Sequence, residues 1–360
     1  MEQKHSKILI IGPSWIGDMV MAQSLFIKLK ELYPDSQITV TAPNWSLPLL
    51  QRMPEVTKAV ANTFTHGELA LGKRRKLGKE LELENYDLSI VLPNSFKSAL
   101  VPFFANIKSR RGLKGEQRYI LLNQMYKNIK QTLPLMVQRY VACAFNPNTC
   151  NISKPEDLGH IPYPKLTVNL DSIPDVCRKL NIEYNTHTLG ICPGAEYGEA
   201  KRWPAEYYAE IIKSWIKSRG VACIFGSGKD QTTADKIVTH IPEELRSKCF
   251  ILTGKTSLTE AIDLLAHCEI VVTNDSGLMH VTAAVGTPLI AVYGSSTTGY
   301  TPPLSHKAKT VFLNLECRPC FKRECPLGTT ACLRQITPEI VLEKLNEALN
   351  TELKKLVNDP

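Results

Sequence analysis

Residues 269–294, EIVVTNDSGLMHVTAAVGTPLIAVYG, constrain the fold more than any other stretch of the chain. The β-branched run at 270–272 predicts a buried strand, and the apolar run at 288–293 predicts another. Between them, the turn and cap residues Thr-Asn-Asp-Ser-Gly lead into a short amphipathic segment that ends at Gly286. This order of strand, loop, helix and strand predicts a parallel α/β unit.

The loop of this unit predicts an anion site. A helix that begins at the carboxyl end of a strand presents free backbone N–H groups and the positive end of its dipole. Gly277 lets an anion approach the backbone, Asp275 can accept hydrogen bonds from sugar hydroxyls, and His280 adds a donor one turn later. The alternative, and the commoner use of such residues, is that Asp275 or Ser276 caps the helix and His280 packs on the sheet.

Strand and helix patterns alternate along most of the chain. The patterns predict strands at 7–12, 37–42, 87–92, 189–192, 221–225 and 250–252, and helices at 19–32, 47–53 and 258–266. This alternation predicts an α/β fold of doubly wound parallel sheets. The first loop is neither a Walker loop nor a G-x-G-x-x-G dinucleotide fingerprint.

The length of 360 residues exceeds what one hydrophobic core usually supports, so we predict two domains. Residues 146–187 are rich in Pro, Asn, Asp and Ser and show little periodicity, which is typical of a region between domains. We predict an N-terminal Rossmann-like domain at 1–170, a linker at 171–187 and a C-terminal Rossmann-like domain at 188–337. The segment 338–360 should form a helix that packs on the outside or crosses back to the first domain.

The composition favours a soluble, cytoplasmic protein with an acidic partner. No run of eighteen apolar residues and no signal-peptide pattern occurs. Lys plus Arg is 43 against Asp plus Glu at 35, a formal charge of +8, with basic runs at 73–76 and 108–118. Such an excess suits nucleic acid, a phosphorylated ligand or an anionic membrane surface, although a solvated surface would show it too.

Four of the eleven cysteines are bunched in a C-x2-C-x4-C-x6-C pattern. Four thiols in sixteen residues could bind a structural zinc ion, while free thiols or a reversible disulfide are the alternative. The candidate zinc ligands are Cys317, Cys320, Cys325 and Cys332.

Four long motifs stand in order along the chain: GPSWIGDMVMAQSLF, LPNSFKSALVPFF, CPGAEYGEAKRWP and TNDSGLMHVTAA. Through them the chain resembles the heptosyltransferases of glycosyltransferase family 9, from about residue 7 to residue 303. The resemblance implies a GT-B fold, in which two Rossmann-like domains face a cleft. It also implies an ADP-heptose donor on the C-terminal domain, a lipid A-core acceptor on the N-terminal domain, and inversion at the anomeric carbon without a metal or other cofactor.

The likeness is greatest to members that add the second L-glycero-D-manno-heptose to heptosyl-Kdo2-lipid A in lipopolysaccharide inner-core biosynthesis. We therefore expect a cytoplasmic enzyme that can associate peripherally with the inner membrane and has no nucleic-acid partner. The alternatives are a family member that adds the first heptose and another GT-B sugar-nucleotide enzyme such as an epimerase. A more remote one is a zinc-stabilised nucleic-acid-binding protein, against which the sparse aromatics argue.

The resemblance assigns roles by position in this sequence. Asp18 matches the catalytic base that an inverting transfer needs at the acceptor hydroxyl; alternatively, Asp18 only complements the dipole of its helix. Lys201 and Arg202 can stabilise the departing diphosphate. The candidates for donor binding are Lys201, Asp230, Thr256, Asp275, Ser276, Gly277, Leu278, Met279 and His280. The candidates for acceptor binding are Trp15, Gly17, Asn94, Ser95, Lys97, Arg74, Arg75 and Arg118.

Overall fold

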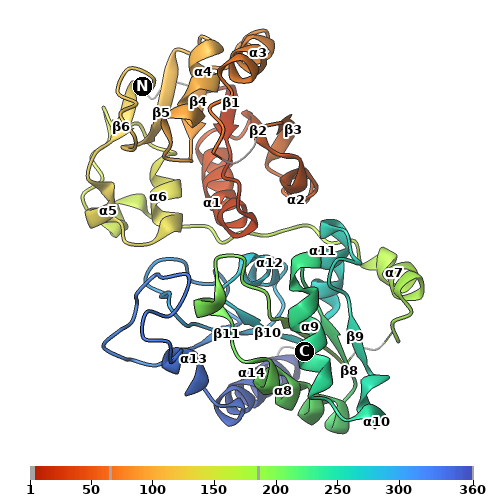
Figure 1. Cartoon of the computed structure of the whole chain (residues 1–360). Coiled ribbons are helices and arrows are strands. Elements are labelled where there is room, and N and C mark those ends of the chain that lie inside the picture. The colour runs from red at the N-terminus through yellow and green to blue at the C-terminus, as the bar shows by residue number, and fades with distance from the viewer. Residues whose placement is uncertain (1–4, 65–66, 185–186, 359–360) are drawn as a thin grey trace. The chain divides into compact units, whose positions relative to one another are not determined.

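The computed structural model describes residues 5–64, 67–184 and 187–358, with side chains up to Thr351. The chain divides into two compact units, Met1–Leu166 and Thr167–Pro360, and each unit is built on one sheet (Figure 1). Among the described residues, no helix is both long enough and apolar enough to cross a membrane.

The first unit contains a six-stranded parallel sheet in the order β3-β2-β1-β4-β5-β6. Its central strands are almost wholly apolar, and their side chains are buried, as a sheet covered on both faces requires. Helix α1 packs on α6, and α3 packs on α4. The elements are β1 Lys7–Ile11, α1 Ile16–Leu32, β2 Gln37–Pro43, α2 Leu47–Leu50, β3 Val56–Asn62, α3 Leu71–Glu82, β4 Leu88–Val91, α4 Leu100–Phe104, β5 Ser109–Leu113, β6 Gln124–Tyr126, α5 Ile129–Thr132 and α6 Met136–Ala142.

The second unit contains another six-stranded parallel sheet, in the order β12-β11-β10-β7-β8-β9. Helix α8 packs with α9 and α14, whereas α11 packs with α7 and α12. The elements are α7 Ile173–Leu180, β7 Thr188–Cys192, α8 Ala205–Ser218, β8 Val221–Ile224, α9 Gln231–Thr239, α10 Glu243–Arg246, β9 Cys249–Ile251, α11 Leu258–His267, β10 Ile270–Asn274, α12 Gly277–Ala284, β11 Leu289–Val292, β12 Ala308–Val311, α13 Ala331–Arg334 and α14 Pro338–Asn358.

The expected doubly wound parallel sheets are therefore confirmed, one in each unit. Helix α1 begins at Ile16, three residues earlier than the sequence pattern indicated. The sequence pattern did not reveal this earlier start, because the first turn, Ile-Gly-Asp, contains glycine and an acidic residue that also suit a loop.

The region that the sequence suggested as a linker, 171–187, contains helix α7. A proline in the first turn and Asp175 suit a helix start as well as a loop, which is why composition alone did not reveal this helix. It packs on α11, and Asn169, four residues before the helix, donates its backbone N–H to Asp263 Oδ1 at 2.8 Å. Residues 185–186, within the same region, lie outside the described residues.

Helix α14 packs against α8, β11 and β12. Val341, Leu345 and Leu349 of this helix belong to the hydrophobic core of the second unit, together with Trp203 and Trp215. The helix thereby covers the sheet of the second unit, and its amphipathic spacing of buried residues accounts for that packing.

Replacement of Leu345 with alanine should lower the free energy of unfolding of the second unit. The side chain is 3% exposed, and deletion of buried methyl groups leaves a cavity, so we expect a loss of about 2–5 kcal/mol. Urea denaturation measures this change. The neighbouring exposed Asn346→Ala serves as the control and should shift stability by less than about 0.5 kcal/mol. Equal stability of the two variants would show that α14 does not support the core.

Candidate functional site

The topological switch of the second sheet lies between β7 and β10. These strands are neighbours, with Thr273 opposite Cys192, but the chain continues from them toward opposite edges of the sheet. In open α/β sheets, ligands bind at such a switch point, beside the loops that follow the two strands. The motifs CPGAEYGEAKRWP and TNDSGLMHVTAA supply these two loops.

The buried side chain of Asn274 fastens the two loops to each other. Its amide nitrogen donates to Pro193 O at 2.6 Å, and its oxygen accepts the backbone N–H of Trp203 at 3.1 Å and the hydroxyl of Tyr208 at 2.9 Å. The side chain is fully buried, so these bonds replace those it would make with water. Sequence analysis did not single out Asn274, although a polar residue that ends an apolar strand was a signal of such a role.

Lys201 and Asp275, two expected donor-site residues 74 positions apart, form a direct ion pair. Lys201 Nζ lies 2.6 Å from Asp275 Oδ2, and the hydroxyl of Ser296 donates to the same oxygen at 2.5 Å. The Asp275 side chain is only 4% exposed and that of Lys201 16%. This pair places a cation at the switch point. Ser296, which follows β11, was not predicted.

The first turn of α12 lies next to this pair. Ser276 is the N-cap residue but makes no side-chain cap bond, and the hydrogen bonds found for the Asp275 carboxylate go to Lys201 and Ser296. The capping alternative for these residues is therefore not what the structure contains. Ser276, Gly277 and Leu278 are half-buried, so the backbone N–H groups of the first turn are near the surface of the protein.

His280 is buried one turn into α12, with 5% of its surface exposed. Burial lowers the pKa of its imidazole to about 4; Lys201 also lowers this pKa, and Asp275 opposes the change. The ring is therefore neutral at pH 7, when one nitrogen donates a hydrogen bond and the other accepts one. The side chain of Met279 is fully buried, which leaves its backbone for ligand contact.

Asp230 and Thr256 follow the next two strands of the sheet. Asp230 Oδ2 accepts hydrogen bonds from the backbone and the hydroxyl of Ser227, both at 2.9 Å. A Cβ atom on Gly194 would lie 2.6 Å from Asp230 Oδ1, so only glycine lets this carboxylate lie over the loop after β7. Thr256 is half-buried in the loop after β9, the edge strand of the sheet.

The first unit has its own switch point, between β1 and β4. Asp18 lies in the first turn of α1, which follows β1, and is half-buried. Gly17 beside it is buried, and the N-cap residue Trp15 is 47% exposed. Asp18 is thus placed near the positive end of the helix dipole, the position that its alternative role of complementing that dipole requires.

Arg118 shapes the loop after β4, which carries Asn94, Ser95 and Lys97. Its guanidinium is 1% exposed and donates to Pro93 O at 2.5 Å, to Leu113 O at 2.6 Å and to Asn94 Oδ1 at 3.3 Å. Burial lowers the pKa of Arg118 to about 10. The hydrogen bonds of Arg118 are thus used within the protein. Asn94, by contrast, is exposed and Lys97 is half-buried, so these side chains reach the surface.

Arg74 is also turned inward. It is 5% exposed, its Nε donates to Leu69 O at 2.7 Å, and its guanidinium lies 3.9 Å from the ring centre of Phe64. Arg75, the next residue, is exposed. Arg110 similarly donates to Leu121 O and Ile107 O. Part of each basic run therefore supports loops, because arginine can satisfy several buried carbonyl groups.

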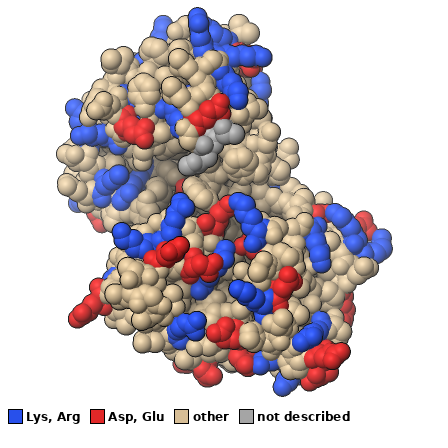
Figure 2. All heavy atoms as spheres, in the orientation of Figure 1, with Lys and Arg blue, Asp and Glu red and all other residues tan. Residues whose placement is uncertain are grey.

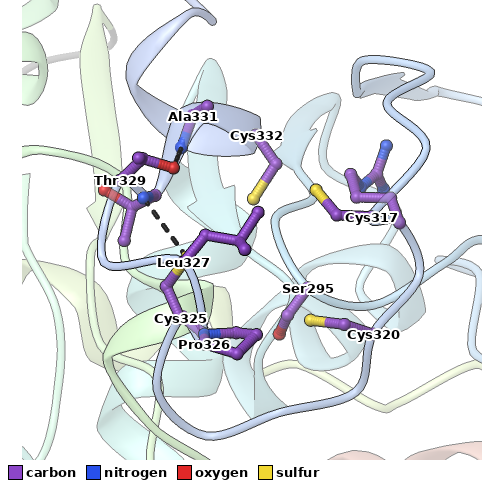
Figure 3. Close-up of a pocket in the computed structure, with 12 residues that line it drawn as sticks. Ser295, Cys317, Cys320, Cys325, Pro326, Leu327, Thr329, Ala331 and Cys332 are labelled. Carbon is purple, nitrogen blue, oxygen red and sulfur yellow. Dashed lines mark hydrogen bonds between the residues drawn. The ribbon is translucent and has the colours of Figure 1, made fainter.

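The four clustered cysteines line one small pocket of the second unit (Figure 3). Each is a free thiol, and no three or more His, Cys, Asp or Glu side chains within the described ranges are arranged to hold a metal ion. The expected structural zinc is therefore not supported. Bunching in sequence places the four thiols around one pocket, but not in the convergent arrangement that a tetrahedral zinc ion requires. A backbone N–H bond from Thr330 lowers the pKa of Cys325, whereas burial raises that of Cys332.

The sequence of the chain matches that of a known class of glycosyltransferase. The family model for glycosyltransferase family 9 (heptosyltransferase) matches residues 74–331, and the chain belongs to this family. It is 50% identical to lipooligosaccharide heptosyltransferase 2 of Haemophilus influenzae, over 95% of this chain and 99% of that protein. It is 45% identical to lipopolysaccharide heptosyltransferase 2 of Escherichia coli K12, over 96% of this chain and 99% of that protein.

The fold comparison agrees with the sequence comparison. The solved structure of E. coli ADP-heptose LPS heptosyltransferase II superposes with a TM-score of 0.87 at 44% identity, covering 96% of this chain and 99% of that one. A family 9 glycosyltransferase from Veillonella parvula shares the fold, with a TM-score of 0.83 at 17% identity. The family and the fold expected from the four motifs are thus confirmed.

The buried His280 should make stability depend on pH. Its folded-state pKa of about 4 lies below the ordinary value of 6.5, so the unfolded chain binds more protons between these values. Stability should fall as the pH drops through this window. The wild-type protein loses free energy of unfolding between pH 7 and pH 5, and His280→Gln should make this loss smaller by about 1–2 kcal/mol. Urea denaturation of both proteins at each pH measures it, and identical losses would contradict a buried neutral imidazole.

Proposed function

We propose that this chain transfers L-glycero-D-manno-heptose from ADP-heptose to the first heptose of heptosyl-Kdo2-lipid A. The observation that carries the proposal is the 45–50% identity, over 95–96% of the chain, to four proteins named heptosyltransferase 2. The ion pair at the switch point of the second sheet adds a chemical reason, because it offers a lysine and a helix N-terminus to a diphosphate.

In the proposed donor complex, Lys201 turns from Asp275 to the diphosphate, and backbone N–H groups of Gly277, Leu278 and Met279 bind its oxygens. Asp275 is then available to accept hydrogen bonds from heptose hydroxyls, and neutral His280 supplies a further donor. Ser276 adds a hydroxyl, Asp230 bonds to the ribose, and Thr256 contributes to the adenine pocket. All of these residues belong to the second unit.

The proposed reaction is a displacement with inversion. Asp18 accepts the proton of the attacking acceptor hydroxyl while the bond to the anomeric carbon forms. The bond from that carbon to the diphosphate breaks at the same time, and the negative charge passes to ADP. Lys201 and Arg202 stabilise this charge, assisted by the dipole of α12. Arg202 is half-buried and pairs with Glu199 at 2.6 Å.

We propose that the acceptor binds to the first unit. Trp15, Gly17 and the exposed or half-buried residues Asn94, Ser95 and Lys97 are the proposed contacts, with Arg75 as a further cation. Arg118 and Arg74 act through the loops that they hold in place. Lysines and arginines are interspersed with acidic residues on the face that Figure 2 shows. Peripheral attachment to the inner membrane from the cytoplasm would use cations near the acceptor, such as Lys97 and Arg75.

The direct test offers the purified protein ADP-heptose with two acceptors, Kdo2-lipid A and heptosyl-Kdo2-lipid A. Mass spectrometry of the products should show one added heptose on the heptosylated acceptor alone. Transfer to unheptosylated Kdo2-lipid A would instead identify an enzyme that adds the first heptose. Turnover of ADP-heptose to another nucleotide sugar without an acceptor would favour an epimerase.

We further propose that transfer needs no metal ion, because Lys201, Arg202 and the N-terminus of α12 supply the positive charge near the diphosphate. The initial rate should be unchanged, within about twofold, in excess EDTA. A rate that EDTA abolishes and only Mg²⁺ or Mn²⁺ restores would contradict this.

Lys201→Ala should weaken the use of the donor. Loss of one charge-assisted contact is worth about 1.5–3 kcal/mol, or roughly ten- to a hundredfold in affinity or rate. Calorimetric titration with ADP and the KM for ADP-heptose measure this loss. Lys213→Ala is the matched control, since Lys213 also forms a 2.6 Å ion pair, on α8 with Glu210. Wild-type kinetics in a folded Lys201→Ala protein would show that the donor site lies elsewhere.

Asp18→Asn should reduce kcat by roughly 10²–10⁴-fold, because the amide keeps the size of the side chain but cannot accept the proton. The affinity for ADP should barely change. If Asp18 only complements the helix dipole, the variant should instead lose up to about 1 kcal/mol of stability and keep its turnover. Measurement of kcat, ADP affinity and Tm on one preparation separates the two roles. Asp35→Asn, at an exposed position of the same unit, controls for the change of charge.

A further inference from the structure

Four thiols surround one cavity outside the proposed donor site. Cys317, Cys320, Cys325 and Cys332 come from the segment after β12 and from α13 and line a cavity of about 20 Å³ (Figure 3). Such a cavity has room for a water-sized molecule but not for a sugar or a nucleotide. The pocket is therefore too small for a substrate, and its chemistry is that of the thiols themselves.

The segment that carries these thiols is bonded to the loop after β7 and to the loop after β11. Arg323 O accepts the backbone N–H of Ala200 at 3.0 Å, next to Lys201. Phe321 donates its backbone N–H to Ser295 O at 2.9 Å, and Ser295 in turn donates to Ala200 O at 3.1 Å. Ala200 and Ser295 also line the cavity itself. A shift of this segment must therefore move the backbone on either side of the donor site.

Arg318 adds a second connection. It lies between two of the thiols in sequence, and its guanidinium donates to Gly294 O at 2.5 Å and to Ser296 O at 2.8 Å. The hydroxyl of Ser296 bonds to the Asp275 carboxylate, which holds Lys201. The position of Arg318 thus fixes the group that orients the ion pair of the donor site.

We propose that the four-thiol pocket is a site of reversible oxidation by peroxides, and that the disulfide formed there weakens binding of the adenine-nucleotide donor. This inference rests on the proposed function, since it assumes that the donor binds at Lys201 and Asp275. The pocket is a reaction site because all four thiols line it and none of them is fully buried, whereas the cysteines of the two sheets are mostly buried.

Cys325 is the thiol that reacts first. Its sulfur accepts the backbone N–H of Thr330 at 3.4 Å, a contact that favours the thiolate over the thiol. The thiolate attacks one peroxide oxygen, so that an S–O bond forms, the O–O bond breaks and hydroxide leaves. The sulfur loses two electrons, and the peroxide gains them. A second thiol of the pocket then attacks the sulfenic sulfur, which forms the disulfide and releases water.

The experiment compares the fully reduced protein with protein treated with hydrogen peroxide. Peptide mapping by mass spectrometry should find a disulfide between Cys325 and another thiol of the pocket, and dithiothreitol should reverse it. Calorimetric titration should show ADP bound roughly 5- to 150-fold more weakly by the oxidised form, the usual range of coupling between two sites. In glutathione buffers, saturating ADP should shift the thiol–disulfide equilibrium toward the thiols by the same factor.

Two variants separate the pocket from a general effect of peroxide. Cys325→Ser should bind ADP as the reduced protein does and keep that affinity after peroxide. Cys150→Ser, at a half-buried position of the first unit, should respond as the wild-type protein does. If Cys325→Ser fails to fold, recovery of ADP affinity when dithiothreitol reduces the oxidised wild-type protein tests the same point.

Three results would overturn the inference. One is a disulfide in the pocket with unchanged ADP affinity, which leaves the proposed function intact. Another is an equivalent of zinc or iron bound to the isolated protein and lost on thiol modification, since the thiols would then be ligands. A reduced protein that does not bind ADP at all would remove the proposed donor, and this inference with it.

Discussion

The loops at the switch point of the second sheet depend on the buried amide of Asn274. This side chain ends β10 and bonds to Pro193, Trp203 and Tyr208, so one residue holds two loops that belong to neighbouring strands of the switch. An unsatisfied buried polar group costs about 1–3 kcal/mol, so all three partners must be in place together. The loop after β7 is consequently fixed with Lys201 beside Asp275, and the ion pair follows from the packing beneath it.

The topology of the two parallel sheets explains why the four motifs, which are far apart in sequence, form two pairs of loops, one pair in each unit. In each unit the chain starts at a central strand, proceeds to one edge and returns to the other side of its starting strand. The loops at this point come from β1 and β4 in the first unit and from β7 and β10 in the second. Each of the four motifs begins at the carboxyl end of one of these strands. The position of a motif relative to its strand thus says more about its role than its spacing from other motifs.

Alternating apolar runs and turn residues predicted the central strands of both sheets, because buried parallel strands have a distinct pattern, but they did not predict β3, β5, β6 or β12. The cluster at 273–277 likewise predicted the Asp275 part of the site. Ser296 and Asn274 could not be predicted in the same way, since their role depends on which strands are neighbours. Arg74 and Arg118 show a related limit: positive charge in the sequence suggested surface cations, whereas the structure uses both guanidinium groups to bond buried carbonyls. Charge composition does not distinguish these uses, because arginine serves both.

The ion pair between Lys201 and Asp275 has a consequence for the end of the proposed catalytic cycle. In the structure, the lysine has an anionic partner that also accepts a hydrogen bond from Ser296. In the proposed donor complex, a phosphate competes with this carboxylate for the lysine, and the carboxylate regains its partner when the phosphate leaves. ADP without its sugar offers no heptose hydroxyl groups to the carboxylate, so under this proposal the protein itself competes with spent ADP for the lysine. Such an internal competitor would favour product release over product retention.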